Sequence, residues 1–130
     1  MQKNINNTID SLIKQYSSWA TFISNNPNNT MGFYLKTSIC SIYVRNMARG
    51  IISKKHVFSL SSINIEEDYQ NLGILTELIN YIEKNPFLFK EIEVENILTE
   101  RLLHYFIKLN YTPLSNELDR TLPVTVSKII

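Results

Sequence analysis

Cysteine is nearly absent from this chain of 130 residues, in which Cys40 is the single example. One cysteine cannot form an internal disulfide, so we expect Cys40 to be a small core residue in a reducing compartment. Long apolar runs are also missing, because none approaches the roughly 18 residues that a membrane-spanning helix needs. The residues after Met1 lack the apolar core of a signal peptide. These absences predict a cytoplasmic globular protein with no membrane partner.

Acidic residues are missing between Ser11 and Ile65, a range that holds six basic ones. From Glu66 to Glu100 the balance reverses, with nine acidic residues against Lys84 and Lys90. The net charge is only +1, so the asymmetry rather than the total favours an anionic partner. The alternative is that opposite charges meet across the fold.

Apolar periodicity predicts one domain, with an N-terminal helix over about 7–25 and a core over about 31–130. Asn7 or Thr8 could cap the first helix. Ile92 and Val94 alternate with glutamates, which is typical of a half-buried strand. The order of elements predicts an α/β fold: a mixed, mostly antiparallel central sheet with helices on both faces. Further helices are expected over 73–84 and 98–109, and strands over 33–35, 39–47, 56–65, 92–94 and 122–126, the last at an edge or beginning at Pro123.

The segment from Tyr69 to Thr76 carries the strongest functional signal. It follows an apolar run and opens an apolar-periodic segment, so a strand should turn through Gly73 into a helix. A helix start leaves several backbone N–H groups unpaired, and these groups and the helix dipole favour bound phosphate. The segment therefore predicts a phosphate-binding loop, with an ordinary strand-to-helix turn as the alternative.

The spacing Gln70-x-x-Gly73-x-Leu75 resembles the pyrophosphate-binding loop of the GNAT family of acetyl-CoA-dependent N-acetyltransferases. A second resemblance runs from Val94 to Leu98 and from Tyr105 to Tyr111, which are similar to the family's "V-x-N" strand end and "Phe-Tyr-x-Lys-Leu-Gly-Phe" helix. Over roughly residues 38–115 the chain thus looks like a compact GNAT fold, and it also resembles small GNAT-like proteins found in phage genomes.

The resemblance implies an acyltransferase that moves an acetyl group from acetyl-CoA, its co-substrate, to an unidentified amine acceptor. Backbone groups of Ile63 and Ile65 would orient the pantetheine and the thioester. Glu66 or Glu67 could remove the proton from the amine, or could form an exposed acidic turn. The remaining residues implied to bind the cofactor are Gln70, Asn71, Leu72, Gly73, Ile74, Leu75, Thr76 and Asn96.

The chain departs from the family pattern at three places. Leu75 replaces a small residue, and we expect its side chain to point into the core. Phe106 aligns with the family's general-acid tyrosine but cannot donate a proton, and Tyr105 lies about 100° away around the helix axis. Before residue 30 the chain supplies one helix and no first strand. These departures keep open a second hypothesis, a catalytically degenerate GNAT-fold module that binds nucleic acid or a host protein.

Tyr43, Arg45 and Arg49, with Lys54 and Lys55, could line a groove for an anionic acceptor or nucleic acid. The alternative is that they form the solvated side of a sheet. A homodimer through the N-terminal helix or the last strand is a third possibility. His56 and His104 have no neighbour at metal-ligand or catalytic-triad spacing, so no metal site is expected.

Overall fold

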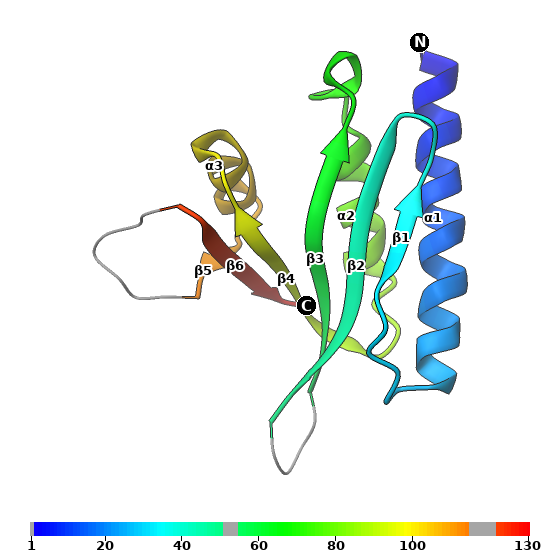
Figure 1. Ribbon diagram of the computed structural model, residues 1–130, viewed down its shortest axis with the longest axis vertical. Helices are drawn as coiled ribbons and strands as arrows, with labels where there is room; N and C mark the ends of the chain where they lie inside the picture. Colours follow the sequence, from blue (N-terminus) through cyan, green and yellow to red (C-terminus); the bar gives the residue numbers. More distant parts are fainter. Residues whose placement is uncertain (1, 51–54, 115–121) are drawn as a thin grey trace.

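The computed structural model describes residues 2–50, 55–114 and 122–130. Their strands form one six-stranded sheet in the order β1-β2-β3-β4-β6-β5. In chain order the elements are α1 (Gln2–Asn25), β1 (Phe33–Lys36), β2 (Cys40–Arg49), β3 (Lys55–Ile65), the 3-10 turn η1 (Glu67–Tyr69), α2 (Ile74–Lys84), β4 (Phe89–Ile97), α3 (Glu100–Lys108), β5 (Thr112–Pro113) and β6 (Val124–Ile129) (Figure 1).

The sheet is mixed, because β3 and β4 are parallel and every other neighbouring pair is antiparallel. Parallel strands need a crossover, which α2 provides. The pairing of β3 with β4 ends at Leu60 and Val94, whereas β3 continues to Ile65. The two strands therefore diverge at this end of the sheet (Figure 1). The expected α/β class and the mostly antiparallel sheet are confirmed.

Helices α1 and α2 pack side by side on one face of the sheet, over an aromatic cluster. The rings of Tyr16 and Trp19 from α1 meet Phe58 of β3 edge-on, with centroids 5.5 and 5.8 Å apart. Helix α3 lies beside α2, since Thr76 Oγ1 and Tyr105 OH are 2.6 Å apart. Helix α3 follows β4 and packs against it. The apolar residues of the central strands point to the face that α1 and α2 cover, whereas the glutamates of β4 alternate with them and point to the other.

Strand β4 is more buried than its sequence pattern predicts. Glu91 and Glu93 are only 6% and 4% exposed, so the prediction of a half-buried strand was wrong. Glu91 lies 2.9 Å from Lys55, and Glu95 lies 2.5 Å from Arg45. A buried carboxylate is tolerated when a cation or hydrogen-bond donor compensates it. The alternating glutamates of β4 therefore lie on a face where cations pair with them, and not on a solvent-exposed face.

Helix boundaries differ from the prediction mainly at their starts. Helix α1 begins at Gln2, and Thr8 is a buried residue within it rather than a cap, because the apolar stripe extends back to Ile5. Helix α3 is capped by Thr99 and begins at Glu100, two residues after the predicted start. Of the two readings of Pro123, the strand start applies, since β6 begins at the next residue and lies between β4 and β5.

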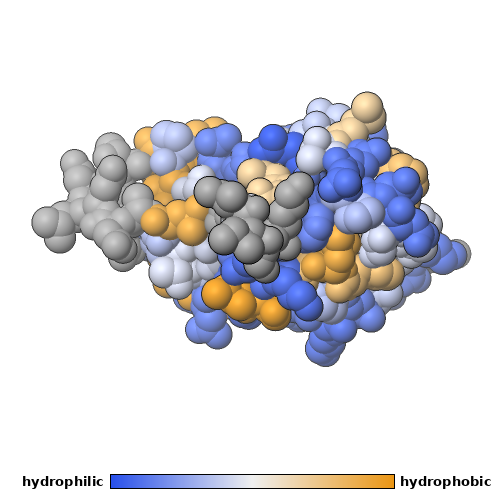
Figure 2. All heavy atoms as spheres, turned by 90° about the horizontal axis from the view of Figure 1, so that it is seen from below, coloured by the Kyte–Doolittle hydropathy of each residue, from blue (hydrophilic) through white to orange (hydrophobic). Residues whose placement is uncertain are grey.

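The surface is largely polar where Figure 2 shows it, with apolar residues in separate patches. Scattered apolar side chains are normal on a protein surface. Among the described residues, no helix combines the length and the apolar character needed to cross a membrane.

Candidate functional site

The loop before α2 uses two left-handed residues to turn the chain into the helix. Asn71 and Gly73 have φ of 65° and 84°, a region that asparagine and glycine adopt most readily. The N–H of Glu77 donates to the carbonyl of Gly73 at 2.9 Å, which closes the first helical turn. The N–H groups of Ile74, Leu75 and Thr76 precede that bond and have no acceptor within the helix.

The start of α2 also lacks a side-chain cap, because Gly73 occupies the capping position. Helix α3 offers the contrast within the same chain. Its cap, Thr99, accepts a hydrogen bond from the N–H of Leu102 at 3.2 Å. The first turn of α2 thus keeps its donors available to a ligand, and the helix dipole makes them attractive to an anion.

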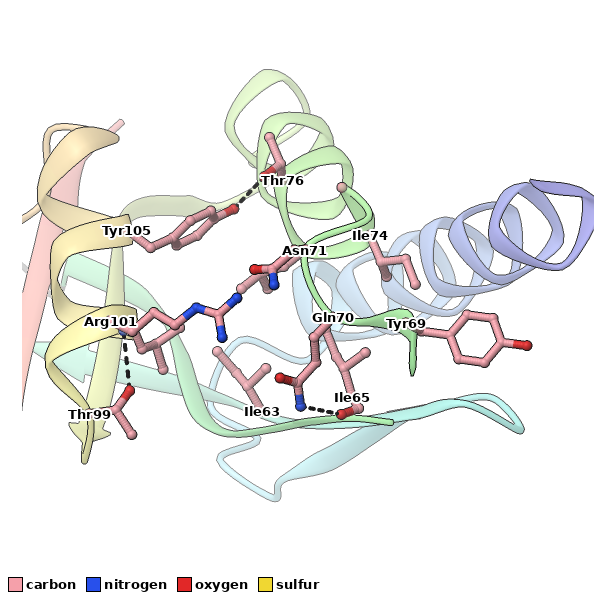
Figure 3. A pocket seen from close by; sticks show the side chains of 13 residues that line it. Ile63, Ile65, Tyr69, Gln70, Asn71, Ile74, Thr76, Thr99, Arg101 and Tyr105 are labelled. Carbon is pink, nitrogen blue, oxygen red and sulfur yellow. Dashed lines mark hydrogen bonds between the residues drawn. The ribbon is translucent and has the colours of Figure 1, made fainter. Parts of the chain in front are cut away.

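A cavity of about 330 Å³ opens in front of this helix start. Figure 3 shows it bounded by the end of β3, the loop, α2 and α3. Five lining residues are not among those implied to bind a cofactor: Tyr69, Thr99, Arg101, Leu102 and Tyr105. The structure brings together eight of the ten residues implied to bind a cofactor: Ile63, Ile65, Gln70, Asn71, Gly73, Ile74, Leu75 and Thr76.

Four other residues implied for the site do not line this cavity. Leu72 is 40% exposed and borders a second cavity between α1 and α2. Asn96 is exposed at the end of β4, with φ of 54°. Glu66 and Glu67 are exposed in the turn after β3, where the N–H of Glu66 donates to the carbonyl of Ile39. Their part in catalysis stays a prediction.

Gln70 ties the loop to the strand before it. Its Nε2 donates a hydrogen bond of 2.9 Å to the carbonyl of Ile65, as drawn in Figure 3. The side chain thus fixes the distance between the end of β3 and the start of α2 that a ligand would bridge.

Leu75 does not take the core position expected of it. It is half-buried and lines the cavity, whereas the buried positions of α2 are Ile74, Leu78, Ile79 and Ile82. The buried stripe begins one residue earlier because Ile74, Leu78 and Ile82 repeat every four residues, close to one helical turn. Leu75 thus packs against the edge of the core and also lines the cavity, where it fills more space than a small residue would.

The α3 side of the cavity carries Tyr105 rather than Phe106. Phe106 is fully buried and packs against Tyr111, with ring centroids 5.2 Å apart. Tyr105 lines the cavity, and its hydroxyl lies 2.6 Å from Thr76 Oγ1. Burial raises the pKa of Tyr105, partly opposed by the hydrogen bond to Thr76. Its hydroxyl therefore keeps its proton at neutral pH and can donate it.

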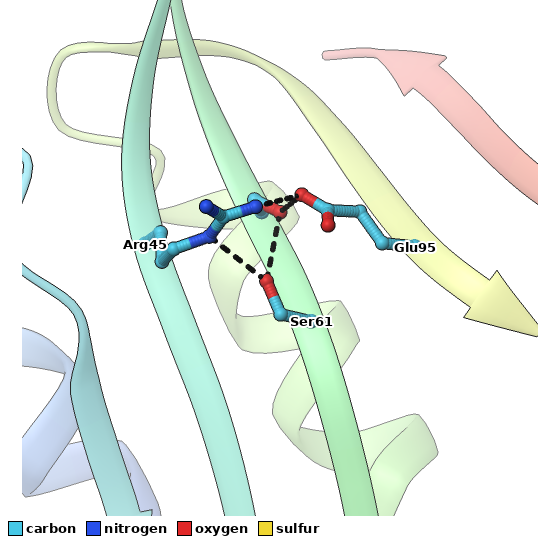
Figure 4. Close-up of polar contacts among 4 residues, drawn as sticks. Arg45, Ser61 and Glu95 are labelled. Carbon is cyan, nitrogen blue, oxygen red and sulfur yellow. Dashed lines mark hydrogen bonds and ion pairs between the residues drawn. The ribbon is translucent and has the colours of Figure 1, made fainter.

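The basic region is partly neutralised by the glutamates of β4. Arg45 forms an ion pair with Glu95 at 2.5 Å and donates to Ser61 Oγ at 3.1 Å (Figure 4). Since Lys55 pairs with Glu91 in the same way, opposite charges do meet across the fold. The ring of Tyr43 packs 4.7 Å from that of Tyr34. The side chain of Arg49 and all of Lys54 lie outside the described residues.

The two histidines and the cysteine make contacts within the fold and lie outside the cavity. His56 Nδ1 lies 3.0 Å from Asn46 Oδ1, and His104 lies 3.8 Å from Glu100 on the surface of α3. Cys40 is buried as expected. In the part of the chain that the structure describes, no three His, Cys, Asp or Glu side chains gather as metal ligands.

No protein-family model matches the sequence, and no curated protein matches it. Solved structures match its fold. A mutant of the AtaT toxin, bound to acetyl-CoA and the C-terminus of the antitoxin AtaR, has a TM-score of 0.52 at 13% identity, over 70% of this chain and 58% of that one. Arabidopsis thaliana NAA60 with a bisubstrate analogue has a TM-score of 0.54 at 10% identity, over 71% and 65%.

The KacTA–DNA complex has a TM-score of 0.53 at 11% identity, over 87% of this chain and 79% of that one. The match thus spans less than two thirds of the AtaT and NAA60 chains and more of the KacTA chain. At identities this low, the structural likeness shows a shared fold and nothing more.

Proposed function

We propose that this chain, which has the fold of the GNAT acetyltransferases, binds acetyl-CoA and transfers its acetyl group to an amine. One observation carries the proposal: the uncapped start of α2 opens, through left-handed Gly73, onto a cavity between β3 and α3. A diphosphate suits the free N–H groups of that helix start. Acetyl-CoA carries such a diphosphate and supplies the thioester that an amine attacks.

The end of β3 offers the next binding element. Past Leu60 its edge has no pairing with β4, so backbone groups around Ile63 face the gap between the diverging strands. Such groups hydrogen-bond an extended amide chain as a neighbouring strand would, and the pantetheine arm has that character. The apolar side chains of Ile63 and Ile65 line the cavity and would exclude water from the thioester.

Two proton transfers complete the reaction. The amine nitrogen loses a proton as it forms the new bond to the acetyl carbon, and Glu66 or Glu67 could accept that proton through water. The bond from the acetyl carbon to sulfur breaks, and the thiolate gains a proton. Tyr105 could donate it, because its hydroxyl lies at the cavity and is protonated at neutral pH.

The alternative of a degenerate module for nucleic acid or a host protein depends on the basic region. Two of its cations, Arg45 and Lys55, are paired with glutamates, which reduces the charge available to a polyanion. We therefore rank acetyl transfer first, with the acceptor among small amines and peptide amines.

Calorimetric titration with acetyl-CoA and with CoA tests the proposal. The wild type is expected to bind with micromolar affinity, and Gly73→Trp to lose binding, because its indole would enter the open space beside Gly73. Leu98→Trp is the matched control, since Leu98 is 69% exposed and lies outside the cavity. No binding by the wild type at millimolar acetyl-CoA would refute the proposal. Binding would then be followed by release of free CoA thiol with a panel of amines and peptides.

A further inference from the structure

Arg101 reaches the cavity from the side opposite α2. It lies in the first turn of α3, and it is one of the lining residues that the sequence motifs do not contain. Figure 3 shows its side chain extending from α3 into the cavity, with the guanidinium directed at Asn71 and Gln70 of the loop.

No acidic side chain among the described residues that line the cavity balances the positive charge of Arg101. Among the described residues that line the cavity, Arg101 is the only one with a charged side chain. Nothing in the described part of the chain forms a hydrogen bond or an ion pair with it, although Arg45 and Lys55 on the other face of the sheet both have carboxylate partners. An arginine directed into a cavity without a carboxylate favours an anionic ligand there.

We infer that Arg101 binds the diphosphate of the co-substrate from the α3 side. A guanidinium presents parallel N–H donors that match two phosphate oxygens, and such charge-assisted pairs are stronger than neutral ones. The diphosphate then lies between the guanidinium of Arg101 and the loop at Asn71. This inference deepens the proposed function and rests on it for the identity of the ligand.

The test compares two ligands, acetyl-CoA and inorganic pyrophosphate, by calorimetry. Arg101→Gln removes the charge, Arg101→Lys keeps the charge without the fork, and Lys108→Gln removes an exposed charge at the far end of the same helix. Arg101→Gln is expected to weaken both ligands about tenfold or more, and Arg101→Lys less, whereas Lys108→Gln stays within about twofold. Because both positions are exposed, equal melting temperatures would show that the variants fold.

The other outcomes of this test show whether the role of Arg101, the proposed function or both are wrong. Equal acetyl-CoA affinity in the wild type and Arg101→Gln overturns the role of Arg101 and leaves acetyl-CoA binding intact. Pyrophosphate binding that depends on Arg101, without acetyl-CoA binding, refutes the proposed function and keeps the anion site. A loss confined to acetyl-CoA, or an equal loss in Lys108→Gln, overturns the assignment to the diphosphate. Failure of both ligands to bind the wild type overturns both proposals.

Discussion

Substitutions at Gly73 separate the backbone role of this residue from its role at the cavity. Gly73 has φ of 84° and ψ of 1°, and no heavy atom lies within 4 Å of the Cβ that alanine would add. Gly73→Ala therefore introduces strain without a clash. The left-handed region disfavours alanine by about 1 kcal/mol, so the free energy of unfolding should fall by about that amount. For a domain of this size the melting temperature should fall by roughly 3–5 °C.

Gly73→Asn should cost less stability than Gly73→Ala but more affinity for acetyl-CoA. Asparagine tolerates the left-handed region better than alanine, as Asn71 and Asn110 do here with φ of 65° and 72°. Its amide side chain, however, would occupy space beside the free N–H groups of α2. We expect stability to decrease in the order wild type, Gly73→Asn, Gly73→Ala. Affinity for acetyl-CoA should decrease in a different order: wild type, Gly73→Ala, Gly73→Asn.

Equilibrium denaturation measures the first order and calorimetry the second. Asn110→Ala is the control, because it adds comparable strain at the end of α3, outside the cavity, and should leave affinity unchanged. Acetyl-CoA at 100 times its dissociation constant should add about 2.7 kcal/mol to the stability of the wild type. If the two orders coincide, affinity follows stability, and the reasoning that places the ligand beside Gly73 is refuted.

Three further predictions concern other groups. Tyr105→Phe should keep acetyl-CoA affinity within about twofold and lower the turnover number by about a hundredfold, and unchanged turnover would exclude Tyr105 as the proton donor. Arg45→Met and Glu95→Gln, combined in a double-mutant cycle, should show a coupling of about 1 kcal/mol, since both side chains are partly exposed; a coupling near zero would mean that the pair contributes nothing. Burial raises the pKa of Tyr16 and of Tyr111 above the usual value, so the folded state holds these protons more tightly. Their contribution is complete below about pH 10, and above it the free energy of unfolding should fall by up to about 1.4 kcal/mol per pH unit for each tyrosine; a flat profile in denaturation between about pH 8 and 11 would contradict this.

The elements that sequence predicts well are those whose signals are local. The helices and all the strands except the two-residue β5 were found from periodicity, and the loop at Gly73 from a single glycine between an apolar run and an apolar stripe. Most of the residues implied to contact a cofactor lie together for the same reason, since they are consecutive in the chain. The local sequence pattern was therefore enough to predict the part of the candidate site that the single loop before α2 forms.

The features that sequence did not predict depend on what faces each residue. The burial of Glu91 follows from Lys55 on the neighbouring strand, 36 positions earlier in the chain. The choice between Tyr105 and Phe106 follows from the rotation of α3 about its axis, which the packing of Phe106 on Tyr111 fixes. Arg101 belongs to no motif, and only the approach of α3 to the loop brings it to the cavity.

Three unusual local features of this chain lie at one cavity, although Phe87, Asn96 and Asn110 also have a positive φ elsewhere. The loop holds left-handed Asn71 and Gly73, the start of α2 has no cap, and Arg101 enters without a carboxylate partner in the described residues. Glycine at a capping position gives up only about a few tenths of a kcal/mol relative to serine, threonine or aspartate, but it leaves the first N–H groups without a side-chain partner. The same chain uses such a cap at Thr99, on the other side of the cavity, so the omission at α2 is specific to that helix. Because sequences are usually locally consistent with their folds, conflicts that lie together point to a binding site, and two of them, the uncapped start of α2 and the unpaired Arg101, would be relieved by the same ligand, the anion that we propose for the cavity.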